Sequence, residues 1–400
     1  MTISWPFKFL ALTIIITWIS VSSTVLADNN CANREATSSF GTWQRLGYVL
    51  SSEKNFKSVS EDDFQNAPTS SIRLQIKDNI TGSRSWVIFV RDDVGRPLSV
   101  IRRRSSVAAT KGFWTERVRG NRVNIEVLGL KPTEEITIVG GIAYPAESNQ
   151  VHLFSTKMPE PDWHEAYKSG DVIRKLADPV AFFLTSGTSP NGELESWTCT
   201  SVLVEDDTIL TNWHCGGAKW LNSSLYWNSE VLSNCLLEFR WDGGTSSSQF
   251  GCGELIIADP VLDFALVKIE PLAAGAPLNS LPIPVEISVG NQATSNLLVV
   301  HHARSLAKNL SRNCASVAEA DRPQFFFHNC DTDPGASGAP VFDERDGRVV
   351  GLHHAGFERD KDCRILARNN EAVGMTSIKE AACKVSVVRA KLPRLCGTKG

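Results

Sequence analysis

The chain has 400 residues, more than one ordinary hydrophobic core accommodates, so two domains are expected. A net charge of −3 argues against a strongly basic surface of the kind that binds nucleic acid or anionic membranes. The short basic run at 102–104 is better explained as a solvated strand end or a processing site. We therefore expect no nucleic-acid partner.

The first 27 residues have the pattern of a secretory signal peptide, 1–27. Lys8 precedes an apolar stretch at 9–19, and the small residues Val25 and Ala27 fit a signal-peptidase site. A retained N-terminal anchor is the alternative, because the apolar stretch is rather long. No later stretch approaches ~18 uninterrupted apolar residues. The sequence thus predicts a secreted or periplasmic protein with no stable membrane insertion after signal cleavage.

Residues 28–157 predict a small β-sandwich-like accessory or pro domain. Segments 85–90, 122–127 and 135–139 alternate apolar and polar residues, with turn signals between them. They carry no catalytic constellation. The domain is expected to be a propeptide, an inhibitor, a binding module or a structural appendage, and the sequence does not choose among these.

Residues 158–179 break this pattern and predict a linker with one or two helical turns. The dibasic pair Arg174-Lys175 is a candidate maturation site, since exposed polar linkers are preferred sites of proteolytic nicking. Dibasic pairs are also common on ordinary surfaces, so the pair by itself does not establish a cut.

Short apolar runs recur from residue 180 onward and predict an all-β barrel or sandwich domain over 180–396. One amphipathic helix is expected to close this domain at 377–391. The expected strands are 180–184, 201–204, 209–211, 236–241, 254–257, 264–269, 297–301, 325–328 and 349–353.

The chain contains ten cysteines, which in an exported protein predict disulfides rather than reduced thiols. Zinc is the alternative, but no Cys-x-x-Cys occurs and the cysteines are not interleaved with histidines at ligand spacing. We expect no metal and no cofactor. The near-neighbour pairs Cys235/Cys252 and Cys314/Cys330 are expected bridges. The sequence does not assign the partners of Cys31, Cys363, Cys383 and Cys396.

Ser337 lies between Gly335 and Gly338 in the segment Asp331-Thr-Asp-Pro-Gly-Ala-Ser-Gly-Ala-Pro340. Small neighbours leave its hydroxyl uncovered and let nearby N–H groups converge on one point, as an oxyanion hole requires. A serine hydroxyl is a poor nucleophile until a base takes its proton. His214, in Thr211-Asn-Trp-His-Cys215, is the candidate base.

Asp263 is the expected third member, because the alternating run to Ile269 begins immediately after it. Asp207 and Asp259 compete for this role, and Asp259 is fixed against Pro260. An α/β-hydrolase nucleophile elbow is a poor match, since position 339 is alanine and the order of the three residues differs.

The order His214, Asp263, Ser337 resembles the chymotrypsin-like serine peptidases, in which these residues follow one another across two β-barrels. The resemblance covers roughly 180–390 and is nearest to the bacterial-type glutamyl endopeptidase branch. It implies a two-barrel peptidase domain with a C-terminal helix. It also implies a disulfide between Cys199 and Cys215, because Cys215 directly follows the histidine and Cys199 stands sixteen residues earlier.

The resemblance implies an exported serine endopeptidase acting on protein or peptide substrates. Ser337 would attack the scissile carbonyl, His214 would transfer the proton, and Asp263 would orient the imidazole. The N–H groups of Gly335 and Ser337 would bind the oxyanion. Trypsin-type zymogens mature when a new α-amine pairs with an Asp before the serine; here that residue is Ala336, so this pairing cannot form.

The resemblance also suggests a specificity pocket. Thr332 and His353 match the glutamyl endopeptidase residues that accept an acidic P1 side chain, which predicts an acidic or amide P1. Gly356 would lie where substrate backbone pairs. Asp331 falls where trypsin keeps its aspartate, so a basic P1 is the alternative. His354 points to the other face of its strand and is expected to be structural.

Adjacent His301 and His302 face opposite ways on a strand and so do not simply share a metal ion; structural roles are expected for both. Two rival functions remain. One is a catalytically silent peptidase homologue that acts as a binding protein. The other is an N-terminal domain that delivers the function and is released by the peptidase. The sequence does not predict the oligomeric state.

Overall fold

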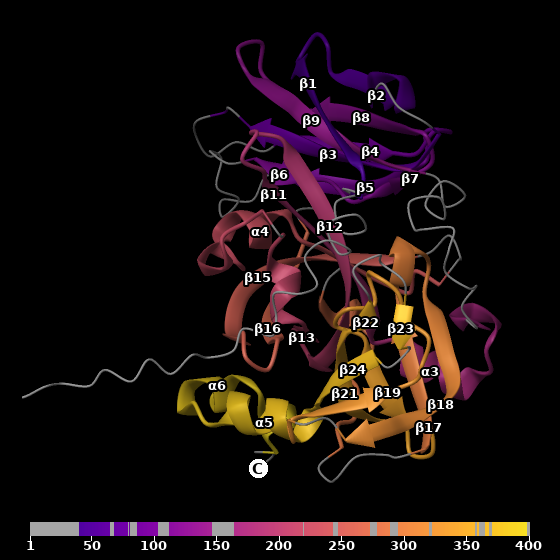
Figure 1. Ribbon diagram of the computed structural model, residues 1–400. Helices are drawn as coiled ribbons and strands as arrows, with labels where there is room; N and C mark the ends of the chain where they lie inside the picture. The colour runs from indigo at the N-terminus through magenta and orange to yellow at the C-terminus, as the bar shows by residue number, and fades with distance from the viewer. Residues whose placement is uncertain are drawn as a thin grey trace, which may run out of the picture.

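The computed structural model describes residues 40–64, 68–78, 80, 86–102, 112–145, 164–218, 220–242, 247–272, 278–288, 295–319, 322–356, 358–359, 365–367 and 370–397. Within these ranges, a smaller N-terminal β domain lies above a larger two-barrel domain (Figure 1). The expected signal peptide 1–27, Cys31 and Cys363 lie outside the described residues.

The N-terminal domain consists of two antiparallel sheets packed on one apolar core, which confirms the predicted sandwich. Alternation along the strands supplies this core: Ile72, Leu74 and Ile76 of β3 and Ile88 and Val90 of β4 are fully buried. One sheet contains β1 (Thr42–Ser51), β9 (Glu135–Pro145), β3 (Thr69–Asp78), β6 (Phe113–Trp114) and β7 (Val118–Arg119); the other contains β2 (Phe56–Ser60), β8 (Arg122–Leu128), β4 (Val87–Arg91) and β5 (Pro97–Arg102).

The first barrel of the larger domain is closed and six-stranded. Its continuous apolar strands bury side chains on both faces, one toward the barrel interior and one toward neighbouring elements. In barrel order the strands are β11 (Val180–Thr188), β12 (Leu194–Glu205), β13 (Thr208–Thr211), β16 (Phe264–Pro271), β15 (Ser248–Asp259) and β14 (Leu236–Phe239). The helix α4 (Ser229–Asn234) lies against β11 and β15.

The second barrel is closed by the pairing of β18 with β19, so the larger domain has the two-barrel architecture predicted. The strands are β18 (Asn309–Glu319), β17 (Ser295–His301), β20 (Pro340–Asp343), β21 (Arg348–Ala355), β24 (Asn370–Gly374) and β19 (Phe325–His328). A separate two-stranded ladder joins β22 (Glu358–Arg359) to β23 (Ile365–Ala367).

Residues 164–179, part of the expected linker, pack against the second barrel. The strand β10 (His164–Glu165) pairs with β18, and the helix α3 (Asp171–Ala177) follows it. Ala177 belongs to the apolar core, and its carbonyl accepts a hydrogen bond from the buried Lys308 Nζ at 2.8 Å. Buried contacts of this kind tie the segment to the barrel.

The expected helix at 377–391 is divided into α5 (Met375–Cys383) and α6 (Ser386–Lys391), followed by α7 (Pro393–Cys396). Val385 has extended backbone angles, which ends the first helix before the second begins. Ile378, Val388 and Leu395 from the three helices join the same apolar core. The predicted apolar side is therefore buried although the helix is not continuous.

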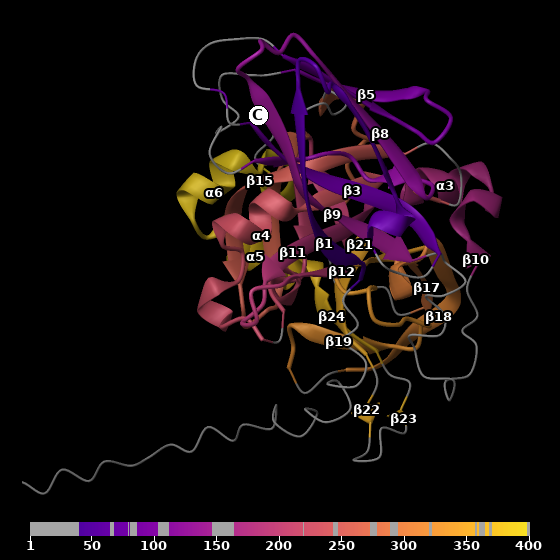
Figure 2. The ribbon, with the colours of Figure 1, turned by 90° about the horizontal axis from the view of Figure 1, so that it is seen from above.

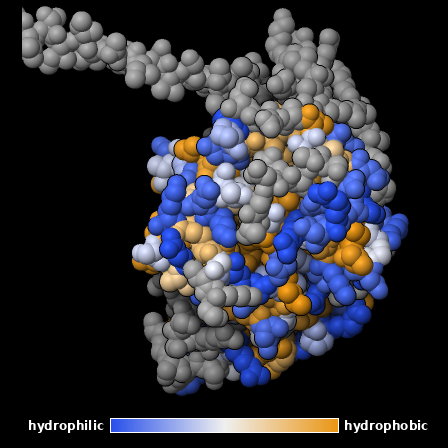
Figure 3. Space-filling view, turned by 90° about the horizontal axis from the view of Figure 1, so that it is seen from below, coloured by the Kyte–Doolittle hydropathy of each residue, from blue (hydrophilic) through white to orange (hydrophobic). Residues whose placement is uncertain are grey.

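Four disulfides connect described cysteines: Cys199–Cys215, Cys235–Cys252, Cys314–Cys330 and Cys383–Cys396. The last pair resolves two of the cysteines that the sequence left unassigned. Within the described ranges, no helix has both the length and the apolar character needed to cross a membrane. On the face opposite the N-terminal domain, hydrophilic and hydrophobic residues are interspersed (Figure 3).

Candidate active site

His214 and Asp263 are brought together by strand pairing in the first barrel. His214 lies in the short helix η5 (Trp213–Gly216) directly after β13, and Asp263 directly precedes β16, which pairs with β13. His214 Nδ1 lies 2.8 Å from Asp263 Oδ2, and the His214 backbone N–H donates to Oδ1 at 3.0 Å. These two contacts fix the imidazole relative to the carboxylate.

The two competing aspartates have other partners. Asp259 Oδ1 accepts hydrogen bonds from the N–H groups of Val261 and Leu262, at 2.8 and 3.0 Å, so it stabilises a turn. Asp207 Oδ2 lies 3.2 Å from Lys268 Nζ. Asp263 is the aspartate that contacts His214.

The Ser337 loop is attached to the first barrel. The Ser337 carbonyl accepts a hydrogen bond from Thr200 N at 2.8 Å, and Cys215 Sγ lies 3.9 Å from the same oxygen. Gly338 has φ +84°, and a Cβ there would lie 2.1 Å from the Thr200 carbonyl oxygen. Glycine at 338 therefore permits both the turn and the close approach of this loop to Thr200 of β12.

The Ser337 side chain is half-buried. In the described part of the chain, no hydrogen bond joins its hydroxyl to His214, and the N–H groups of Gly335 and Ser337 donate no hydrogen bond. Catalytic hydrogen bonds are often long or misaligned without substrate and tighten when it binds.

The segment preceding Ser337 is braced by residues that the sequence analysis did not single out. Arg304 Nε pairs with Asp333 Oδ2 at 2.6 Å, and both side chains are buried. The Arg304 N–H donates to the Pro334 carbonyl at 2.7 Å, and Thr200 Oγ1 donates to the Gly335 carbonyl at 2.8 Å. Neither Arg304 nor Asp333 has a local sequence signal, because their ion pair joins two distant loops.

His354 contacts the same aspartate as His214. His354 Nδ1 lies 3.2 Å from Asp263 Oδ2, and its Nε2 lies 3.1 Å from Glu371 Oε2. Glu371 is in turn paired with Arg322 at 3.0 Å. The strand period predicts a structural histidine here, on the face opposite His353. The structure shows that this face meets the other barrel at Asp263.

Charge stabilises this group of residues. Burial by itself would raise the pKa of Asp263, but the imidazoles of His214 and His354 outweigh it and hold the pKa well below its usual range. Burial favours the neutral form of His354, yet the carboxylates of Asp263 and Glu371 raise its pKa above the ordinary value. Both ring nitrogens of His354 face carboxylates, as in an imidazolium that donates from each.

The expected pocket residues lie beside the Ser337 loop. The N–H of Gly338 donates to the His353 carbonyl at 2.9 Å. Thr332 and His353 are buried, with 2% and 4% of their surface exposed. Thr332 Oγ1 lies 3.7 Å from the place where a Cβ on Gly356 would stand. Asp331 is half-buried, and its carbonyl accepts from Ser311 Oγ at 2.5 Å.

Asn370, which the sequence did not single out, lies beside the expected pocket residue Gly356. Its Oδ1 lies 2.5 Å from the position of a Cβ on Gly356, so a side chain at 356 would displace the Asn370 amide. Within the described residues this buried oxygen has no hydrogen-bond partner, while Nδ2 donates to the Cys330 carbonyl. Buried polar atoms are usually paired, so the orphaned oxygen is a candidate contact for a ligand.

His353 is backed by a second buried histidine. His353 Nδ1 lies 3.2 Å from His328 Nε2. Burial lowers the pKa of His328 to about 3 and holds the pKa of His353 well below its usual value. Both rings are therefore neutral near pH 7, and one of them donates to the other. His301 and His302 are also fully buried, and burial lowers the pKa of each.

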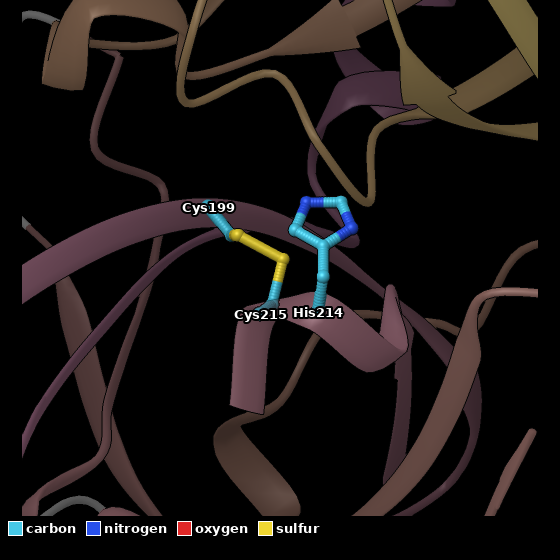
Figure 4. A group of neighbouring side chains, drawn as sticks. All are labelled: Cys199, His214 and Cys215. Carbon is cyan, nitrogen blue, oxygen red and sulfur yellow. A yellow bond between two sulfur atoms is a disulfide. The ribbon is translucent and has the colours of Figure 1, made fainter. Parts of the chain in front are cut away.

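One further group of side chains has donor atoms close enough for a metal. Ligand atoms of Cys199, His214 and Cys215 lie within 4.8 Å of one another (Figure 4). The two sulfurs form a disulfide and are not thiolates, and His214 Nδ1 is occupied by Asp263. This donor set does not fit a zinc site.

Residues 199–352 match the family described as trypsin-like peptidase domain. The matched range contains His214, Asp263 and Ser337. The larger domain is thus a trypsin-like peptidase domain with the chymotrypsin fold, homologous to serine peptidases. No curated protein matches the chain significantly.

Two solved structures are similar to this chain. One is an inactive serine-to-alanine mutant of Rv3671c from M. tuberculosis H37Rv, with 15% identity, a TM-score of 0.36, and 57% of this chain and 97% of that chain covered. The other is the thermostable serine protease AL20 from an extremophilic microorganism, with 13% identity, a TM-score of 0.38, and 50% and 92% covered. Similarity at this level carries no information about substrate or activity.

Proposed function

We propose that this protein is an exported serine endopeptidase that hydrolyses peptide bonds through Ser337, His214 and Asp263. The observation that carries the proposal is the pair of contacts from His214 to Asp263, beside a glycine-flanked serine loop attached to the same barrel. Within a trypsin-like peptidase domain, this arrangement supports nucleophilic catalysis through an acyl-enzyme.

Each residue has a chemical role in this mechanism. Asp263 remains ionised and holds Nδ1–H of His214, which leaves Nε2 to take the Ser337 proton and later give it to the leaving amine. The tetrahedral oxyanion is bound by the N–H groups of Gly335 and Ser337. One such donor is typically worth ~3–4 kcal/mol of barrier stabilisation.

His354 acts as a positioning residue for Asp263. His354 Nδ1–H donates to Asp263 Oδ2, which also accepts a hydrogen bond from His214 Nδ1–H. This second donor restricts rotation of the carboxylate. Its own second nitrogen is fixed by Glu371. A protonated His354 also offsets the charge of Asp263 in a buried site, where an isolated carboxylate is costly.

The proposed P1 preference is acidic or amide. The Nε2–H of a neutral His353 donates to the substrate when its Nδ1 accepts from His328, and the Thr332 hydroxyl supplies a second donor. Asn370 Oδ1 is an acceptor and favours the NH₂ of an amide over a carboxylate. A basic P1, which the Asp331 carboxylate would favour, is the alternative. Profiling cleavage in a peptide library distinguishes an acidic or amide P1 from a basic one. Dominant cleavage after Arg or Lys that His353→Ala leaves unchanged would contradict the assignment.

Labelling with a fluorophosphonate probe tests the catalytic proposal. Wild-type protein should be labelled, and Ser337→Ala should not. A wild-type protein that folds but does not react would instead favour a catalytically silent homologue acting as a binding protein. The intact set of His214, Asp263 and Ser337 favours the enzyme.

Export rests on two features. Four disulfides connect described cysteines, and disulfides persist in oxidising compartments. The signal-peptide pattern at 1–27 supports the same destination. Mass determination of the mature N-terminus in an exporting host tests this, with cleavage before Asp28 as the expected result.

A further inference from the structure

The N-terminal domain is joined to the first barrel by a buried ion pair. Arg117, between β6 and β7, pairs with Glu238 of β14, and only 3% and 0% of the two side chains is exposed. Arg119 Nη2 lies 3.2 Å from the other Glu238 oxygen. Gln249 accepts from the Arg117 N–H at 2.8 Å and donates to its carbonyl at 3.0 Å. The contact therefore leaves neither buried charge without a partner.

Apolar and polar contacts extend this interface. Arg73 Nη1 donates to the Asn234 carbonyl at 2.8 Å, and Trp114 Nε1 donates to Asn234 Oδ1 at 2.9 Å. Figures 1 and 2 show the N-terminal strands on the side of β11, β12 and α4. One buried apolar cluster contains Phe40, Trp114, Ile142 and Tyr144 from one domain and Phe182, Leu184, Leu236, Trp241 and Leu272 from the other. The junction thus resembles a domain core.

Ring contacts connect this interface to the Ser337 loop, residues 333–338. The Arg117 guanidinium lies 4.2 Å from the centre of the Trp241 ring, and Trp241 stacks on His302 with 5.6 Å between ring centres. The backbone N–H of His302 donates to Thr200 Oγ1 at 3.0 Å, and the Thr200 hydroxyl donates to the Gly335 carbonyl. Four consecutive contacts thus connect Arg117 to the loop that would bind the oxyanion.

Residues 302–308 contact both Trp241 and the Ser337 loop, and two of them have a strained backbone. Arg304 and Ser305 have φ values of 56° and 55°, in the left-handed region that non-glycine residues rarely adopt. Such conformations persist only where surrounding contacts over-determine them. Here the Trp241 carbonyl accepts from Lys308 N at 2.9 Å on one side, and Arg304 binds Asp333 and Pro334 on the other.

We propose that the N-terminal domain is a permanently docked partner that positions the oxyanion loop, residues 333–338, through Arg117, Trp241 and His302. It supports the segment 302–308 in place of the trypsin-type α-amine contact that Ala336 precludes. The domain then promotes activity and is not an inhibitor to be removed. The effect on activity rests on the proposed peptidase function; the positioning itself does not.

Hydrogen exchange in the full chain carrying Ser337→Ala tests the positioning without any need for activity. Trp241→Leu should speed exchange of the amides at 302–306 and 333–338 at least tenfold, and Trp241→Phe by a smaller factor. Ile88→Ala, in the N-terminal core far from these residues, should lower stability without this local change. If Trp241→Leu does not fold, the Trp241→Phe result decides. Wild-type exchange rates in both loops of a folded Trp241 variant would overturn the proposal.

The same substitutions with Ser337 intact test the link to activity. The rate of fluorophosphonate labelling should fall about tenfold in Trp241→Leu and stay near the wild-type rate in Ile88→Ala, measured well below either melting temperature. Faster exchange with unchanged labelling would support the positioning but refute its effect on activity. A wild-type protein that never labels, together with the expected exchange pattern, would reject the peptidase function and leave the docking intact.

Discussion

Asp263 Oδ2 is shared by two histidines: His214 Nδ1 lies 2.8 Å from it and His354 Nδ1 lies 3.2 Å from it. The carboxylate is therefore held from both barrels, because His214 follows β13 and His354 lies on β21. This contact has a consequence for the pH dependence of stability.

His354 should stabilise the protein more at acidic pH than at alkaline pH. Its folded-state pKa is raised by Asp263 and Glu371, so its contribution is complete below the unfolded-state pKa and is lost as pH rises through the folded-state value. His354→Gln should therefore reduce the free energy of unfolding more at pH 6 than at pH 9. Urea denaturation of both proteins at the two pH values measures this; an equal loss at both would contradict it.

Substituting the triad aspartate should remove most activity and little structure. Asp263→Asn keeps the shape of the side chain but cannot hold the Nδ1–H tautomer of His214 in the same way, and a loss of about 10⁴-fold in kcat is typical of this change. Asp259→Asn is the matched control, because Asp259 stabilises a turn. The hydrolysis rate of an ester or peptide substrate measures both, and equal losses in the two variants would refute the role of Asp263.

Glycine at 338 should be indispensable for the nucleophile loop. A Cβ there would lie 2.1 Å from the Thr200 carbonyl and 2.4 Å from Thr211 Oγ1, so Gly338→Ala must displace the loop. Gly95→Ala is a matched control: Gly95 also has positive φ, at +83°, but open space surrounds its Cβ position. We expect Gly338→Ala to abolish fluorophosphonate labelling and Gly95→Ala to cost only about 1 kcal/mol of stability. Normal labelling of Gly338→Ala would show that the loop tolerates the displacement.

The protonation of Glu116, at the interface between the N-terminal domain and the first barrel, should make the free energy of unfolding fall as pH rises toward neutrality. Burial, with the nearby Glu238 carboxylate, raises the pKa of Glu116 to about 7. Between the unfolded-state pKa and pH 7, folding retains a proton that the unfolded chain has released, so the free energy of unfolding falls with rising pH. Glu116→Gln should thus stabilise the protein at pH 8, by up to about 3 kcal/mol, and not at pH 4.5. Thermal melts at both pH values measure the difference, and a uniform effect would argue against it.

Much of the fold follows from local patterns. Period-two alternation predicted the sandwich, because alternate side chains of a strand face the same side. Short apolar runs predicted most of the barrel strands. The segments that form β18, β20 and β24 lack a clear apolar run: the first and last are interrupted by polar residues, and the second has only two apolar residues between Pro340 and Asp343. Their strand conformation depends on neighbours already in the barrel. The single predicted helix at 377–391 was divided because Val385 adopts extended angles.

The sequence by itself determined the identity and order of His214, Asp263 and Ser337, the glycines around the serine, and the opposite orientation of His353 and His354. These features depend on residue type, short spacing and strand period, all of which are local. Only the tertiary structure decided that His354 meets Asp263, 91 residues away, and that Asn370 lies beside Gly356. It also decided that the N-terminal domain joins the first barrel through Arg117 and Glu238, 121 residues apart. Such contacts depend on how barrels and sheets pack, and packing joins side chains whose separation in the chain gives no local signal.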